Sequence, residues 1–323
     1  MLSRVAERMY WFGRYLERAE NMARLVNVNA SLLLDLPRMV KQTWGDLINI
    51  TGCSDLFYDR HEKAEERNVI RFLVAEAGNP GSILSSIRML RENVRTTREI
   101  MPSEAWEQIN EFHIFVKNNV NSALKRDGRH EFLDAVLNFC HLISGLLSSS
   151  MSHGEAYNFT LIGRNIERAD MTTRIIDVGC LNLIHHPDST PETYDNILWM
   201  NILRSLSGYQ MYRQHMLERI NGEDVVAFLM RDKEFPRAII HCLDELNECV
   251  SRLPKNDYPL RSISRVQRAV QELDVIKLMN GKLHEFIDTL QVDLADIHSQ
   301  VSQTWFDYSS NEVLAEQDQA RTG

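Results

Sequence analysis

Arginine and acidic side chains recur at the same spacing in two segments that begin 150 residues apart. The segments are GRYLERAENMARL, residues 13–25, and GRNIERADMTTRI, residues 163–175. Arginines bind carboxylates or phosphates through paired hydrogen bonds, and carboxylates hold amines or metal ions. The charged positions are therefore the first candidates for a functional site: Arg14, Glu17, Arg18, Glu20, Arg24, Arg164, Glu167, Arg168, Asp170 and Arg174.

Helical geometry places the charged residues of the first segment on one side of a helix, opposite its apolar residues. Three interpretations stay open. The charged side is a solvated face with weak pairs, or it is a buried network between helices, where loss of one partner costs about 3 to 5 kcal/mol. In the third, arginines line a cleft and bind an anion, and Glu17 and Glu167 are the catalytic candidates that orient an amine.

Further matches in the same order indicate that the chain contains an internal duplication. The offsets of these matches lie between 154 and 156 residues, close to the 150 of the charged segments. We therefore predict two related halves, residues 1–150 and 151–323, packed as one compact unit about a pseudo-twofold axis. The matching pairs are FLVAEAGNP (72–80) with FLMRDKEFP (228–236), HEFLD (130–134) with HEFID (284–288), and Trp44 with Trp199.

The elements that must position these residues are helices. Apolar residues recur every three or four positions almost throughout the chain, and alternating strand patterns are hard to find. We predict an all-α helical bundle of roughly ten to twelve helices with short connections. A hydrophobic fraction of 44% and a charged fraction of 25% over 323 residues are typical of a soluble globular protein.

Charge and cysteine content argue against several classes of protein. A net charge of -9 disfavours nucleic acid as a partner. Five cysteines without CxxC spacing predict reduced thiols in the cytoplasm. The uncharged stretch 135–154 contains serines, an asparagine and histidines, so we expect a buried core helix and no membrane span.

A second basic feature occurs in only one half. Arg88, Arg91, Arg95 and Arg98 are spaced 3, 4 and 3 residues apart, which predicts a stripe along one helix face, whereas the second half keeps only Arg252 near the corresponding place. The stripe is either a solvated face paired with nearby glutamates or a specialised site.

Asn93 lies on the apolar side of the same predicted helix. A buried asparagine needs hydrogen-bond partners. We expect Asn93 to fix this helix against a neighbour or to reach into a pocket. Trp106 and Asn110 could share that environment, although a core role is expected for Trp106.

Common catalytic signatures are absent from the sequence. It contains no GxxxxGK[ST] or GxGxxG phosphate loop, no HExxH and no GxSxG elbow. His130 and His284 occupy matching positions, which favours packing or capping, and His185-His186 beside Pro187 is expected to be a plain loop. We predict no metal site and no directly bound cofactor.

Three segments taken together resemble the bacterial alpha-E family over essentially the whole chain: LSRVAERMYWFGRYLERAENMARL, NPGSILSSIRMLRENVRTTREIMPSEAWEQIN and GRNIERADMTTR. Members of this family are helical proteins of unassigned activity, encoded beside or fused to a circularly permuted ATP-grasp protein. ATP-grasp enzymes activate a carboxylate as an acyl phosphate and transfer it to an amine. The resemblance implies a role in peptide or amide biosynthesis, with ATP and Mg bound through the partner.

The resemblance also implies which residues matter: the charged positions of both segments together with Glu92, Asn93, Arg95 and Arg98. We expect an accessory or catalytic partner of an ATP-grasp ligase that binds a carboxylate or phosphate intermediate of a small-molecule or peptide substrate. The alternative is a non-enzymatic scaffold whose charged motif is a structural network. The second half has Asp170 in place of Glu20 and lacks the REN stretch, which argues against a symmetrical two-site mechanism. The oligomeric state stays open.

Overall fold

The computed structural model describes residues 1–35, 44–184, 192–216, 219–279 and 281–306. Within these ranges the chain forms fifteen α-helices, one π-helical turn and one 3-10 turn, and no strand. The all-α class is therefore confirmed. The number of helices exceeds the predicted ten to twelve because α2, α3, α4, α10 and α14 have only five or seven residues. Such short helices show no periodicity in a sequence.

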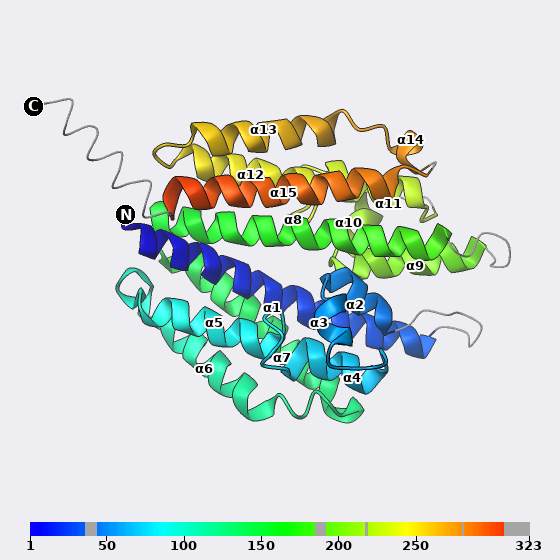
Figure 1. The fold of residues 1–323 in the computed structure, drawn as a ribbon, viewed down its shortest axis with the longest axis horizontal. Helices are drawn as coiled ribbons and strands as arrows, with labels where there is room; N and C mark the ends of the chain where they lie inside the picture. Colours follow the sequence, from blue (N-terminus) through cyan, green and yellow to red (C-terminus); the bar gives the residue numbers. More distant parts are fainter. Residues whose placement is uncertain (36–43, 185–191, 217–218, 280, 307–323) are drawn as a thin grey trace, which may run out of the picture.

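The helices form two groups on either side of a central contact (Figure 1). The first group contains α1 (Ser3–Asp35), α2 (Gly45–Thr51), α3 (Ser54–Tyr58), α4 (Glu66–Ile70), η1 (Arg71–Ala75), α5 (Ile83–Arg95), η2 (Arg98–Ile100), α6 (Ser103–Asn119) and α7 (Arg126–Ser150). The second contains α8 (Glu155–Ile184), α9 (Glu192–Ser205), α10 (Tyr209–His215), α11 (Gly222–Arg231), α12 (Ile239–Ser251), α13 (Asp257–Gln271), α14 (Val275–Met279) and α15 (Leu283–Trp305).

The two longest helices, α1 and α8, pack against each other in the middle of the molecule (Figure 1). Helices α5 and α7 flank α1, and helices α12 and α15 flank α8. In each group an outer helix packs against both flanking helices. This helix is α6 in the first group and α13 in the second. The contacts thus follow the same order in both groups, while a common origin of the two halves stays a prediction.

A continuous hydrophobic core connects the groups. Phe12 and Ile87 from the first group and Ile162 and Leu243 from the second are fully buried in the same cluster. The predicted boundary near residue 150 falls in the short connection between α7 and α8. The two groups therefore share one apolar interior, and α1 and α8 run through it.

Helix α7 carries the uncharged stretch of the sequence. Among the described residues it is the one helix long and apolar enough to cross a membrane by length and composition, a test that core helices also pass. Its buried side chains include Phe132, Val136, Cys140 and Ile143, and it packs against α1 and α6. Only 33% of its apolar stretch is buried, so α7 contributes one face to the core and is not the buried core helix that we expected.

Candidate functional site at the contact of the two long helices

Two glycines let α1 and α8 approach each other closely. A Cβ atom on Gly13 would lie 2.0 Å from the carbonyl oxygen of Thr160, and one on Gly163 would lie 2.0 Å from that of Tyr10. Either contact is far shorter than real Cβ atoms tolerate. The glycine at the start of each repeated segment is therefore required by the packing, and it sets the two charged faces against each other.

The carboxylate of Glu17 on α1 is enclosed by arginines of the second group. Arg168 donates from Nε and Nη2 to both carboxylate oxygens at 3.1 and 2.8 Å, and Arg164 Nε donates at 3.1 Å. Arg237 adds a fourth hydrogen bond of 2.8 Å. The side chain of Glu17 has no exposed surface.

The carboxylate of Glu167 on α8 has the reciprocal environment. Arg18 donates from Nε and Nη2 to its two oxygens at 2.5 and 3.0 Å, and Arg14 Nε donates at 2.7 Å. Arg14 also donates to the hydroxyl of Tyr10, which is hydrogen-bonded to His298 Nδ1. Each glutamate is thus bound by the first two of the three arginines in the other segment, at equivalent positions.

The network extends toward the surface beyond Glu17. Arg237 Nη2 donates to Glu20 at 2.6 Å, and its Nη1 donates to the side-chain oxygen of Asn21 at 2.6 Å. Arg24 and the half-exposed His141 also lie against Glu20. In the second segment Arg174 bonds to Asp170 at 2.9 Å, a local pair on one helix.

The arginines determine the protonation of the buried acids. Burial by itself raises the pKa of Glu167, but Arg18 and Arg14 outweigh it and lower the pKa to about 2. Burial likewise acts against the charged form of Glu17, and Arg168 and Arg237 hold its pKa below the usual value. Both carboxylates are therefore ionised at neutral pH.

Positive charge is in excess within the network. Seven arginines face four acidic side chains: Arg14, Arg18, Arg24, Arg164, Arg168, Arg174 and Arg237 against Glu17, Glu20, Glu167 and Asp170. Two buried donors at one end, Arg24 Nε and Asn21 Nδ2, have no hydrogen-bond partner among the described residues. Burial and the nearby Arg237 lower the pKa of Arg24. The uncompensated charge is concentrated around Arg24 and Arg237.

The arrangement limits what the two glutamates can do chemically. Glu17 accepts four hydrogen bonds from arginines and Glu167 accepts three. A general base or an amine-binding carboxylate needs a free acceptor directed at the substrate. The contacts match the interhelical network among the three interpretations of the sequence, and they do not match a solvated face.

Three of the expected binding residues do not join this network. Arg95 is exposed and pairs with Glu92 on its own helix, and Arg98 is exposed on η2. The backbone oxygen of Asn93 accepts hydrogen bonds from the hydroxyls of Thr96 and Thr97, while its buried Nδ2 has no partner in the part of the chain that the structure describes. The structure therefore separates the basic stripe on α5 from the repeated segments.

Arg91, another member of the stripe, is partly buried. Its Nε donates to Asn110 at 2.8 Å, and its guanidinium lies over the ring of Trp106. Trp106 packs against the core, as expected. Trp106 and Asn110 share an environment with each other, but not the expected one with Asn93. This environment is built around Arg91 and makes no hydrogen bond to Asn93. His185 and His186 lie outside the described residues.

Sequence reasoning missed Arg237, which binds both Glu17 and Glu20. Its backbone oxygen accepts a hydrogen bond from Thr172 of α8, which fixes the segment just before α12. The alignment of the two proline-containing matches places Gly81 opposite Arg237. A charged residue opposite a glycine, directly after the matching prolines, was the available signal.

Comparison with known proteins gives one family and several relatives. The sequence pattern of the Alpha-E family, described as a predicted alpha-helical domain with a conserved ER motif, matches residues 1–306. Two ER pairs of this chain, Glu17-Arg18 and Glu167-Arg168, lie in the network described above. No solved structure matches the chain.

The relatives are mycobacterial and longer than this chain. Uncharacterized protein Mb2597 of Mycobacterium bovis and uncharacterized protein MT2643 of Mycobacterium tuberculosis are each 24% identical to it over 320 residues. Uncharacterized protein Rv2567 of Mycobacterium tuberculosis is 23% identical over the same length. Each match covers 91% of this chain and 34% of the relative, so the chain spans about one third of the relatives' length.

Proposed function

The chain belongs to the Alpha-E family, and we propose that it is a non-catalytic helical module of an ATP-dependent carboxylate–amine ligase system. In this proposal it works in the cytoplasm with a circularly permuted ATP-grasp protein, which binds ATP and Mg and forms the amide or peptide bond. Its two halves descend from one duplicated helical unit, and the paired ER segments hold them together.

The observation that carries the non-catalytic role is the saturation of Glu17. Its side chain is fully buried and accepts four hydrogen bonds from three arginines. The resemblance of the three quoted segments supports the association with an ATP-grasp protein. The length of the relatives agrees with a module that works joined to other polypeptide, because about two thirds of each relative lies outside the match.

The test is to measure ADP release by the neighbouring ATP-grasp protein with candidate amino acids, in the presence and absence of this chain. We expect a complex on gel filtration and a faster or more selective turnover when the chain is added. Glu17→Gln, assayed at a temperature where it stays folded, should keep this effect. Unchanged turnover without a complex contradicts the partnership, and loss of the effect in folded Glu17→Gln contradicts the non-catalytic role.

A second candidate function is binding of an anionic intermediate at the Arg24 end of the network. The excess of arginines and the unpartnered donors Arg24 Nε and Asn21 Nδ2 favour it. A carboxylate or phosphate there would accept these donors and offset the buried positive charge. Phosphate or glutamate should then stabilise the wild-type chain against heating and stabilise Arg24→Gln less. Equal stabilisation of both proteins, or none, excludes this site.

A further inference from the structure

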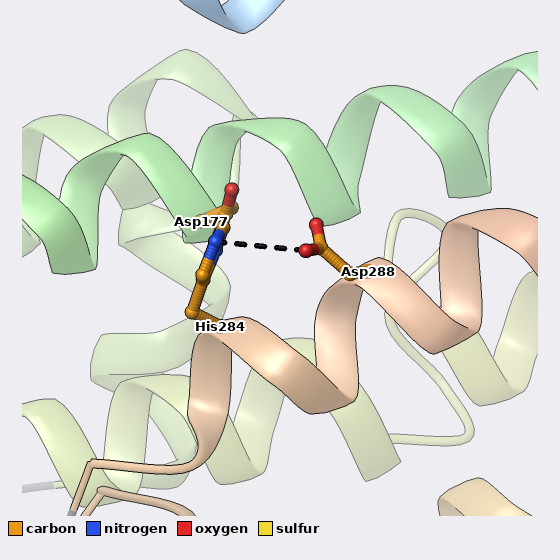
Figure 2. Close-up of side chains that lie close together, drawn as sticks. All are labelled: Asp177, His284 and Asp288. Carbon is orange, nitrogen blue, oxygen red and sulfur yellow. Dashed lines mark hydrogen bonds and ion pairs between the residues drawn. The ribbon is translucent and has the colours of Figure 1, made fainter.

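A histidine and two aspartates meet where α8 packs against α15. Asp177 comes from α8, and His284 and Asp288 lie one turn apart on α15 (Figure 2). One ligand atom from each residue can be chosen so that all three lie within 4.8 Å of one another. Imidazole nitrogens and carboxylate oxygens are ligands that zinc and similar ions accept.

Asp177 fixes the orientation of the histidine ring. His284 Nδ1 lies 2.7 Å from Asp177 Oδ1, and Asp177 is 9% exposed. When the neutral ring donates its Nδ1 hydrogen to this carboxylate, the lone pair of Nε2 is free on the opposite side. Metal-binding histidines are commonly held in this way by a carboxylate on their other nitrogen.

The free nitrogen faces the second carboxylate across a gap. His284 Nε2 lies 3.5 Å from Asp288 Oδ2, which is long for a hydrogen bond. Two ligands of a tetrahedral ion with bonds of about 2.1 Å are separated by about 3.4 Å. The side chains of His284 and Asp288 are 48% and 60% exposed, so an ion can enter and water can complete its coordination.

The corresponding residues of the first half provide an internal comparison. Asn27, His130 and Asp134 form the same arrangement, with His130 Nδ1 2.9 Å from Asn27 Oδ1 and His130 Nε2 3.1 Å from Asp134. The amide of Asn27 also donates to Asp134 at 3.1 Å. Asp177 is a carboxylate and cannot donate such a bond when ionised. The second cluster therefore has one more negative charge and a wider gap.

We propose that Asp177, His284 and Asp288 form a binding site for a divalent transition-metal ion of the zinc type. His284 Nε2 and the Asp288 carboxylate are the protein ligands, Asp177 holds the ring, and water supplies the remaining ligands. The bound ion offsets the charge of the two aspartates. Both protein ligands lie on α15, and the hydrogen bond between His284 and Asp177 links the site to α8. The proposal is independent of any role in a ligase system.

The experiment is calorimetric titration of the tag-free chain with zinc chloride, together with cobalt(II) absorption spectra. We expect one equivalent of zinc to bind and cobalt to give the spectrum of a site with nitrogen and oxygen ligands. His284→Gln should abolish binding, and Asp177→Asn, which gives this cluster the composition of the first, should weaken it about 10- to 100-fold. The matched control His130→Gln should bind like the wild type.

The proposal is overturned if zinc does not bind with defined stoichiometry or if His284→Gln binds it unchanged. A second measurement on the wild type covers the case in which a variant does not fold. Nitrogen NMR of the imidazole rings should show zinc shifting His284 Nε2. A shift confined to other histidines, or no shift, also overturns the proposal.

Discussion

Glu17 and Glu167 occupy equivalent places between the two long helices, yet their surroundings differ. Two arginines of the opposite segment bind Glu167. Glu17 is likewise bound by two arginines of its opposite segment, and by Arg237 as well. The repeated segments therefore account for the reciprocal part of the network. The difference between its two ends comes from a residue outside the repeat, in the segment just before α12.

The additional arginine changes what lies around Glu17. Arg237 bridges Glu17 and Glu20, and the end of the network that it joins also contains Arg24 and His141. The Glu167 end continues instead to the buried Tyr10 and the half-buried His298. Similar sequence segments thus give one end with an additional arginine and a second glutamate, and one end that continues through a tyrosine to a histidine.

The largest effect is expected from Glu17→Gln. It leaves Arg164 and Arg168 without the buried carboxylate that they bind, and breaking such a buried pair costs about 3 to 5 kcal/mol. Urea unfolding should show this loss. Glu167→Gln should cost less, since that carboxylate accepts one fewer charged hydrogen bond.

Glu131→Gln, on an exposed position of α7, is the control and should leave the free energy of unfolding nearly unchanged. A Glu17→Gln protein as stable as the wild type would mean that the carboxylate is held in place for a ligand. Equal losses for Glu17→Gln and Glu167→Gln would remove the distinction between the two ends.

The pH dependence of the unfolding free energy should report the ionisation of Glu167. Its folded pKa of about 2 lies below the unfolded value, so its contribution is complete above about pH 4.5 and is lost as the pH falls toward 2. The contribution lost is up to about 3 kcal/mol. The difference in unfolding free energy between wild type and Glu167→Gln should shrink by this amount over the window. A difference that is constant with pH would show that Glu167 is not ionised in a network.

Gly13→Ala and Gly163→Ala should each destabilise the chain by about 1 to 3 kcal/mol, because the added methyl group meets a backbone oxygen of the other helix. The matched control is Gly145→Ala on α7, where nothing lies within 4 Å. That change should stabilise the chain by about 0.5 to 1 kcal/mol. If all three substitutions stabilise the protein, the two long helices do not touch at these glycines.

The smallest effect on stability is expected from a substitution in the basic stripe on α5. Arg95 and Glu92 are exposed and pair only with each other, so Arg95→Ala should not change the thermal midpoint measurably. The same substitution should change turnover of an ATP-grasp partner only if the stripe contacts that partner. A marked fall in the thermal midpoint would contradict this, because it would mean that Arg95 stabilises the fold through more than its exposed pair with Glu92.

The sequence predicted the helical class and the residues that meet, since a spacing that occurs twice in the chain, such as that of Arg14, Glu17 and Arg18, defines one face of a helix. It could not predict that this face is buried. Periodicity shows which residues share a side but not what covers that side, and a charged face is usually exposed to water. Here the two charged faces form ion pairs with each other because Gly13 and Gly163 bring them together.

Other parts of the site depend on contacts between distant segments. Arg237 and His141 come from elements outside the repeated segments, and no local pattern in the sequence relates them to Glu20. The stripe on α5 had a clear helical spacing, but that spacing gave no information on its distance from the repeated segments. Sequence therefore identified the reciprocal pairs and left out the residues that make the two ends unequal.

Double-mutant cycles give the most direct test of the central claim that the ER pairs bind across the two long helices. Cycles with Glu17→Gln and Arg168→Met, and with Glu167→Gln and Arg18→Met, should yield coupling energies of about 1 to 3 kcal/mol. The cycle within one pair, Glu17 with Arg18, should give less than about 0.5 kcal/mol, since the two side chains bind different partners. Coupling within the pair and none across the helices would contradict the account.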